Sequence, residues 1–186
     1  MKDLKDFDIS FIGLKEGLHQ FEYLIEKEFF DFFNYDELNN SNVIVQLSFL
    51  KKTTMFELNF SFSGWVEVAC DITNELYHQP IKTESELIIK FGETFNNENE
   101  ELLVIPHSEF KVNVAQYIYE SIVLALPLKR IHPGVEDGTL KSDILEKLKE
   151  LEPKELKDKI DKEDIDPRWN KLKNILIDKN TSNGTS

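Results

Sequence analysis

Residues 54–62 read Thr-Met-Phe-Glu-Leu-Asn-Phe-Ser-Phe, and this stretch decides the fold. Its apolar side chains fall at every second position, which is the period of a β-strand with one buried face. The preceding segment 43–51 has the same period. Only Lys52 and Thr53 separate the two segments, which is short enough for a hairpin. The sequence therefore predicts two antiparallel strands that share one buried face.

Further strands are expected on both sides of this hairpin. Alternating or β-branched segments occur at 7–12, 19–25, 65–72, 84–91 and 102–105. We expect Ser63-Gly64 to turn the chain, and the polar, acidic residues 96–101 to form a loop that could accept insertions. Short links without intervening helices indicate an antiparallel sheet, which is either strongly curled or forms a partly open barrel.

Two helices are expected to cover this sheet, which makes the fold class α+β. Residues 26–33 crowd four phenylalanines into a short helix, for which core packing is favoured over an exposed aromatic platform. Asn113 is a suitable N-cap for a helix over 114–126, whose broad apolar face predicts burial against the sheet. Pro127 should end that helix.

The aromatic residues place a boundary in the chain. All 14 phenylalanines lie between Phe7 and Phe110, and after Tyr119 the only aromatic residue is Trp169. We therefore expect a globular domain over 1–135, a charged helical tail over 136–179, and disorder over 180–186. Ser142 can cap a helix over 143–150.

A second tail helix should begin at Asp166-Pro167, an acidic N-cap followed by proline at the first helical position. This helix would be amphipathic. Its apolar stripe comprises Trp169, Leu172, Ile175 and Leu176, and its opposite side carries Arg168, Lys171 and Lys173.

The net charge of −13 is concentrated in the predicted domain. Residues 1–135 hold 22 acidic and 11 basic residues, whereas residues 136–186 hold 13 and 11. Such a surface repels phosphates, so we expect no binding to DNA or to anionic membranes. The N-terminus has no apolar signal region, and no apolar run approaches the roughly 18 residues of a membrane span. We expect a soluble, cytoplasmic protein.

Catalytic motifs are missing from the sequence. It has no phosphate-binding glycine loop and no nucleophile elbow. Its four histidines lie far apart, and Cys70 falls among apolar residues, which favours a buried structural thiol over a reactive one. Acidic residues are plentiful, but no general acid–base pair can be selected. We expect no enzyme and no cofactor; a magnesium-dependent nuclease is the alternative left open.

Three segments in order resemble one protein family. They are Gly64-Trp-Val-Glu-Val-Ala-Cys70-Asp71, then Tyr119-Glu120-Ser-Ile-Val-Leu-Ala-Leu-Pro127, then Asp166-Pro167-Arg168-Trp169-Asn-Lys171-Leu172. Together they resemble the YceD family, the large ribosomal RNA subunit accumulation protein, over roughly residues 5–177. The residues that the resemblance marks as motif or interaction candidates are Gly64, Cys70, Asp71, Glu120, Pro127, Asp166, Pro167, Arg168, Trp169, Lys171, Leu172 and Lys173.

The chain departs from the family pattern at a cysteine pair. Many members carry Cys-x-x-Cys followed by later cysteines, whereas this chain reads Cys70-Asp-Ile-Thr73 and has His132 near the first later position. Cys70 and His132 give at most two ligands, and a structural zinc site requires four. We expect no metal, and we interpret the pair as the remnant of a metal motif.

The resemblance implies a non-enzymatic ribosome-biogenesis factor that supports synthesis, processing or accumulation of 23S ribosomal RNA. Because the domain is acidic, we expect a basic ribosomal or RNA-processing protein as its partner, with ribosomal RNA contacted indirectly or through the tail. The alternative is a general interaction adaptor whose last helix docks into a partner groove. That helix could also pack back on its own domain.

Overall fold

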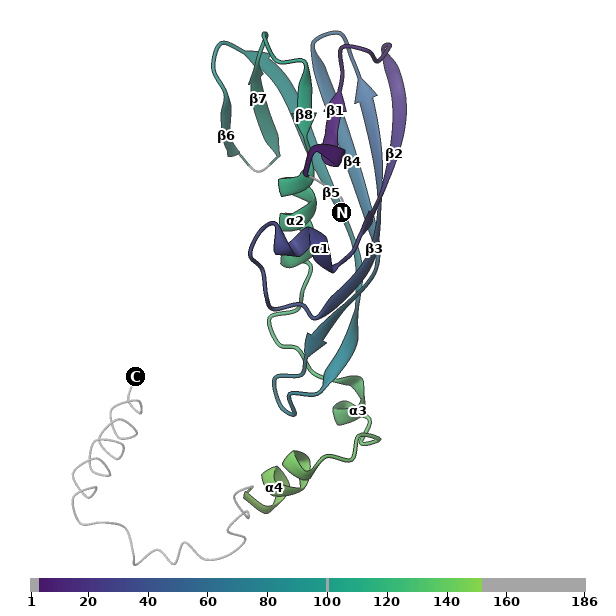
Figure 1. Ribbon diagram of the computed structural model, residues 1–186, viewed down its shortest axis with the longest axis vertical. Coiled ribbons are helices and arrows are strands. Elements are labelled where there is room, and N and C mark those ends of the chain that lie inside the picture. The colour runs from purple at the N-terminus through teal and green to yellow at the C-terminus, as the bar shows by residue number, and fades with distance from the viewer. Residues whose placement is uncertain (1–3, 100, 152–186) are drawn as a thin grey trace, which may run out of the picture. The chain divides into compact units, whose positions relative to one another are not determined.

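The computed structural model describes residues 4–99 and 101–151 of the chain (Figure 1). The chain divides into two units, Met1–Glu146 and Lys147–Ser186, and every described strand belongs to the first. The predicted tail helix at 166–177 lies outside the described residues, as does the predicted disorder of 180–186.

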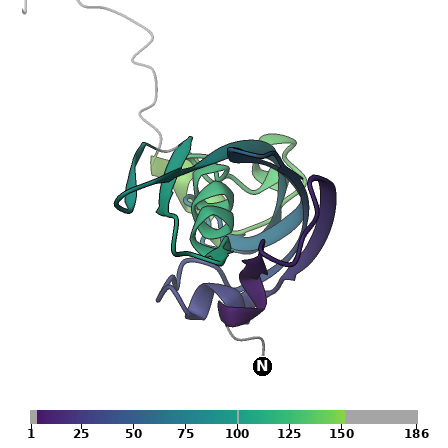
Figure 2. The ribbon, with the colours of Figure 1, turned by 90° about the horizontal axis from the view of Figure 1, so that it is seen from above.

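One six-stranded sheet forms the body of the first unit. Its strands stand in the order β2-β3-β4-β5-β7-β6. Their bounds are Gly17–Ile25, Asn40–Lys51, Met55–Ala69, Leu76–Gly92, Leu102–Pro106 and Asn96–Asn99 in that order. Viewed from above, the sheet curls around α2, Ala115–Leu124 (Figure 2). The outer strands β2 and β6 do not pair with each other, so the sheet is curled but not closed. The predicted α+β class and curled sheet are confirmed.

A two-stranded ribbon joins the N-terminal segment to the chain before α2. The 3-10 helix Leu4–Phe7 leads into β1, Asp8–Ser10, which pairs antiparallel with β8, Lys111–Asn113. The Lys111 ammonium lies 2.6 Å from an Asp8 carboxylate oxygen across this ribbon. The expected strand at 7–12 thus exists, but it lies outside the main sheet.

The core fills the concave side of the sheet. The alternation predicted for the central hairpin is confirmed, because its inward side chains are all at most 2% exposed: Val43, Val45, Leu47, Phe49, Phe56, Leu58, Phe60 and Phe62. Ala115, Ile118 and Ile122 of α2 are buried against the core. The short helix α1, Lys27–Asp31, adds the buried Phe29 and Phe30, so core packing holds for these two rings. Phe32 is 37% exposed.

The predicted turn at Ser63-Gly64 is wrong, because β4 runs through it without a break. Gly64 has φ 151° and pairs with Val43 of β3. A Cβ at Gly64 would overlap the Asn42 carbonyl oxygen and lie 2.8 Å from the Val43 Cα. The glycine is there because two backbones approach closely, as glycine within a strand often permits.

Strand β5 is also longer than the predicted segment 84–91, and it contains Pro80. Only residues 88–92 of β5 pair with β7, so Pro80 lies in the half of β5 that forms an edge of the sheet. An edge tolerates the missing N–H of proline. The β5–β7 pairing is parallel, whereas the sequence predicted only antiparallel pairing. Part of the predicted polar loop forms the exposed strand β6.

The N-cap of α2 differs by one residue from the prediction. Val114 occupies the cap position, while Asn113 ends β8 and accepts a hydrogen bond from the Ala115 N–H at 3.0 Å. The helix ends at Leu124, before Pro127. Two short helices follow, α3 at Pro133–Glu136 and α4 at Asp143–Leu151. The predicted cap of α4 is confirmed by a hydrogen bond from the Ile144 N–H to Ser142 Oγ at 3.4 Å.

Candidate functional site

The loop after β4 carries the first motif residues. Cys70 follows the last strand residue, Ala69, rather than lying within a strand as expected. Its N–H donates to the Glu75 carbonyl at 2.9 Å, and its carbonyl accepts from the Asn74 N–H at 2.8 Å. Asn74 has φ 59°, a left-handed conformation that asparagine tolerates well. These bonds fold residues 70–75 into a tight loop.

The Cys70 sulfur is buried, as predicted, and it is surrounded by donors. The side chain is 2% exposed, and Sγ accepts a hydrogen bond from the His132 N–H at 3.3 Å. Burial raises the pKa of the Cys70 thiol. Hydrogen bonds from the Thr73 hydroxyl and from the N–H groups of His132, Thr73 and Ile72 outweigh burial, so the pKa lies below its usual value. The environment therefore lowers the pKa of a thiol that is almost fully buried.

His132 lies beside Cys70 through its backbone, but its ring has another role. Its Nδ1 accepts a hydrogen bond from the Gly134 N–H at 2.9 Å, which caps α3. The ring also packs edge-on against Tyr77, with 5.5 Å between centroids. Within residues 4–99 and 101–151, no three His, Cys, Asp or Glu side chains lie together in a way that could hold a metal ion. The described side chains near Cys70 therefore do not fit a four-ligand zinc site.

Asp71 fixes the segment after α2 to the end of the sheet. Its N–H donates to the Arg130 carbonyl at 2.8 Å, and its carboxylate accepts from the Arg130 N–H at 2.7 Å. The guanidinium of Arg130 lies 3.7 Å from the other Asp71 oxygen and donates to Glu37 at 3.0 Å. Asp71 thus holds two distant parts of the chain together. We call the set Glu37, Cys70, Asp71, Thr73, Arg130 and His132 the motif loop cluster.

The remaining described motif residues lie elsewhere. Gly64 lies within β4, where the paired strand β3 approaches it closely, and Pro127 follows α2. Glu120 lies on α2, where it accepts a hydrogen bond from the Gln116 amide at 2.8 Å. The structure therefore brings Cys70, Asp71 and His132 together but leaves Gly64 and Glu120 outside that cluster. The six candidates Asp166, Pro167, Arg168, Trp169, Lys171 and Leu172, together with Lys173, fall outside the described residues.

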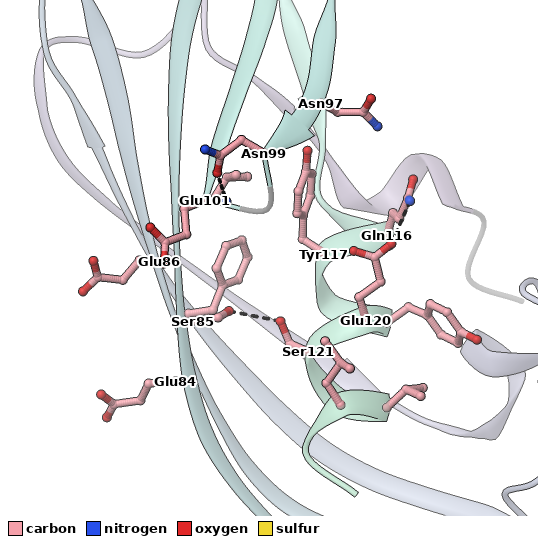
Figure 3. A pocket seen from close by; sticks show the side chains of 15 residues that line it. Glu84, Ser85, Glu86, Asn97, Asn99, Glu101, Gln116, Tyr117, Glu120 and Ser121 are labelled. Atoms are coloured by element: carbon pink, nitrogen blue, oxygen red, sulfur yellow. Dashed lines mark hydrogen bonds between the residues drawn. The ribbon is translucent and has the colours of Figure 1, made fainter.

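A groove of about 810 Å³ runs between α2 and β5 and is bordered by β6 and by Glu101, which precedes β7 (Figure 3). We call it the α2 groove. At its base the hydroxyls of Ser85 and Ser121 lie 3.1 Å apart and face each other. Tyr117 rises from α2 toward Asn97 and Asn99 (Figure 3). Burial, and after it the Glu120 carboxylate, raises the pKa of Tyr117, so its hydroxyl stays protonated and can donate.

The walls of the α2 groove combine apolar and acidic groups. Six apolar side chains contribute: Phe60, Leu87, Tyr117, Tyr119, Val123 and Leu124. Four glutamates contribute: Glu84, Glu86, Glu101 and Glu120. The described lining residues include no Lys, Arg or His. The groove therefore offers apolar contact within a negative potential.

Sequence reasoning missed several residues of both regions. Ser85, Ser121 and Glu101 were not selected as site candidates, although Ser121 lies in the family segment from Tyr119 to Pro127 and Ser85 in the predicted strand 84–91. Arg130 had one usable signal, since it is one of only two arginines in the chain.

In the described part of the chain, no helix is both long and apolar enough to cross a membrane.

Comparison with known protein families gives a match to a family model. The family model described as large ribosomal RNA subunit accumulation protein YceD matches residues 58–176, more than half of the chain. The matched part begins in β4 and includes β5, the α2 groove and the motif loop cluster except Glu37. Neither the curated proteins nor the solved structures include a significant match.

Proposed function

The chain belongs to the YceD family, and on that premise we propose that it supports the accumulation of large-subunit ribosomal RNA without itself being an enzyme. The family match over residues 58–176 is the observation that carries this proposal. Our proposal also includes the finer statement that the protein takes part in synthesis, processing or stabilisation of 23S ribosomal RNA during assembly of the large subunit. A cytoplasmic location stays a prediction.

We further propose that the protein acts through a basic protein partner. Residues 1–135 carry twice as many acidic as basic residues, a charge that repels RNA and attracts basic proteins. Ribosomal proteins and RNA-processing proteins are frequently basic, and an acidic domain would speed their association. Any direct contact with ribosomal RNA would then involve residues 168–173, which lie outside the described part.

The motif loop cluster supports a scaffolding role within this proposal. Cys70 is inaccessible, His132 caps a helix, and Asp71 is engaged by Arg130. These polar atoms are engaged by other groups of the protein, so the cluster is better suited to shaping the chain than to chemistry on a substrate. The alternative of a general adaptor docking through its last helix stays a prediction from sequence.

Depletion of the protein in its own cells tests the proposed function. The expected result is loss of mature 23S ribosomal RNA and of large subunits relative to small ones, restored by the wild-type chain. Normal 23S levels after complete depletion would contradict the proposal. Tight binding of RNA by the full chain with residues 168, 171 and 173 neutralised, at about 0.15 M salt, would contradict the protein-partner part.

A further inference from the structure

The α2 groove has the features of a docking surface rather than of packed protein surface. Leu124 is 81% exposed at one end of the groove, although its neighbours Tyr117 and Ser121 on the same side of α2 are half-buried. These three residues recur at helical spacing, so they form one stripe along the groove. An exposed leucine that continues a half-buried stripe leaves apolar surface uncovered at the groove mouth.

The charges around this stripe are unbalanced. Glu101 and Glu120 are both exposed, and Glu120 has the neutral Gln116 amide as its hydrogen-bond partner. In Figure 3, Glu84 and Glu86 extend from β5 on the side away from α2, so their carboxylates lie on the outer face of the sheet, and the groove charge comes from Glu101 and Glu120. The described lining has no Lys, Arg or His, so no lining side chain neutralises the negative charge of Glu101 and Glu120. A cationic occupant would complement it.

The length of the groove wall limits the size of the occupant. From Gln116 to Leu124 the helix rises about 12 Å, at about 1.5 Å per residue. An extended peptide covers that distance with about four residues at roughly 3.3 Å each. In such a peptide successive side chains point to opposite sides, so aliphatic groups could meet Tyr117 and Leu124 while cationic groups reach the glutamates.

We propose that the α2 groove binds a short basic segment of a protein partner, in which Lys or Arg side chains alternate with aliphatic side chains. This inference rests on the proposed function, because it assigns the surface on which the basic partner docks. RNA is a poor occupant since the carboxylates of Glu101 and Glu120 border the groove. An apolar peptide without cations would leave that charge uncompensated.

The test uses a fluorescein-labelled hexapeptide of alternating lysine and leucine, titrated with the full chain and followed by fluorescence anisotropy. A second peptide carries serine in place of each leucine. The wild type should bind the lysine–leucine peptide about tenfold more tightly than the lysine–serine peptide, since burial of aliphatic groups adds to charge attraction. Equal affinities for the two peptides would overturn the proposal.

Two double variants separate the groove from general charge attraction. E101Q/E120Q removes two carboxylates of the groove, whereas E22Q/E28Q removes two exposed carboxylates that do not line it. The first pair should weaken binding of the lysine–leucine peptide by roughly fivefold to tenfold, from the strength of exposed ion pairs. The second should change it less than twofold. Equal weakening by both would overturn the proposal.

Leu124→Ser tests the apolar part without disturbing the core, because the side chain is largely exposed in the free protein. It should weaken the lysine–leucine peptide by about tenfold at unchanged melting temperature. If Leu124→Ser bound the lysine–leucine peptide as tightly as the wild type does, the proposed apolar contact at Leu124 would be wrong. Concentration-dependent self-association that E101Q/E120Q abolishes would assign the groove to a second copy of the chain, and would also overturn the proposal.

Complementation of depleted cells distinguishes failure of the groove from failure of the function. Wild type and E22Q/E28Q should restore 23S ribosomal RNA, and E101Q/E120Q should not. If E101Q/E120Q loses the peptide but restores the RNA fully, the groove proposal is wrong and the proposed function stands. If depletion leaves the RNA unchanged, the proposed function is wrong, and the anisotropy experiment still decides what the groove binds.

Discussion

Replacing Gly64 by alanine should destabilise the protein severely, for two separable reasons. The backbone at Gly64 has φ 151°, which side chains rarely adopt, and this strain costs about 1–3 kcal/mol. The new Cβ would also overlap the Asn42 carbonyl of β3, so the strands must move apart, as in overpacked sites that cost about 1–3 kcal/mol. The sum is about 4 kcal/mol, a large part of the 5–15 kcal/mol typical of a folded domain.

Two other glycines provide matched controls for this reasoning. Gly17 also has a positive φ, 127°, but a Cβ there would meet nothing within 4 Å, so Gly17→Ala should show the strain alone. Gly13 has open space and no positive φ, so Gly13→Ala should change the free energy of unfolding by less than about 0.5 kcal/mol. The three variants therefore form a series of strain plus overlap, strain only, and neither.

Urea unfolding followed by circular dichroism measures all three free energies under one condition. The expected order of destabilisation is Gly64→Ala, then Gly17→Ala, then Gly13→Ala. If Gly64→Ala were no more destabilising than Gly17→Ala at equal m-values, the argument from close backbone approach would be refuted. A reduced m-value for Gly64→Ala alone would instead show that the native sheet has loosened.

Three further outcomes are expected. Phe30→Ala should lower the free energy of unfolding by about 3–5 kcal/mol, because the ring is fully buried, while Phe95→Ala, at 59% exposure, should have little effect; equal urea midpoints would contradict this. Hydrogen bonds from a lysine and an asparagine of β8 hold the pKa of Asp8 below its ordinary 3.8, so its contribution to stability is present above that pH and is lost as the pH falls through the lowered pKa. Asp8→Asn should therefore reduce the melting temperature at neutral pH, and its difference from wild type should shrink in acid; a constant difference would refute the linkage. Thr73→Val should raise the pKa of the Cys70 thiol by removing one donor, which thiolate absorbance during a pH titration would show, and an unchanged titration would contradict the assigned hydrogen bond.

The sequence predicted those parts of the fold that depend on local alternation. Phe56 to Phe62 and their partners across the hairpin alternate strictly, and one buried face allows only one register. Gly64 misled the prediction because glycine is common in turns, yet here it allows β3 and β4 to approach closely. Pro80, on which the sequence made no prediction, lies in the part of β5 that forms an edge. Those causes depend on which strand lies alongside, and no local pattern reports that.

The candidate sites were less predictable for the same reason. The resemblance marked Cys70 and Asp71, but the partner that defines the role of Asp71 is Arg130, 59 positions later. The α2 groove exists only where α2 meets β5. The contact between the hydroxyls of Ser85 and Ser121 depends on that packing, so neither residue could be selected from its local sequence. Glu120 was selected because it belongs to a segment that resembles the family. That resemblance did not predict that Glu120 lies at the α2 groove.

The ribbon of β1 and β8 has a consequence for the order of folding. It pairs Ser10 with Lys111, so closing it brings together residues about a hundred positions apart, at an entropic penalty of about 4 kcal/mol. The β3–β4 hairpin closes over three residues and can form early. During synthesis, the backbone of β1 therefore lacks its pairing partner until β8 has been made, although the ring partners of Phe7 and Phe11 are made earlier. The ribbon that joins the N-terminal segment to the rest of the fold thus forms only after more than half of the chain has been synthesised.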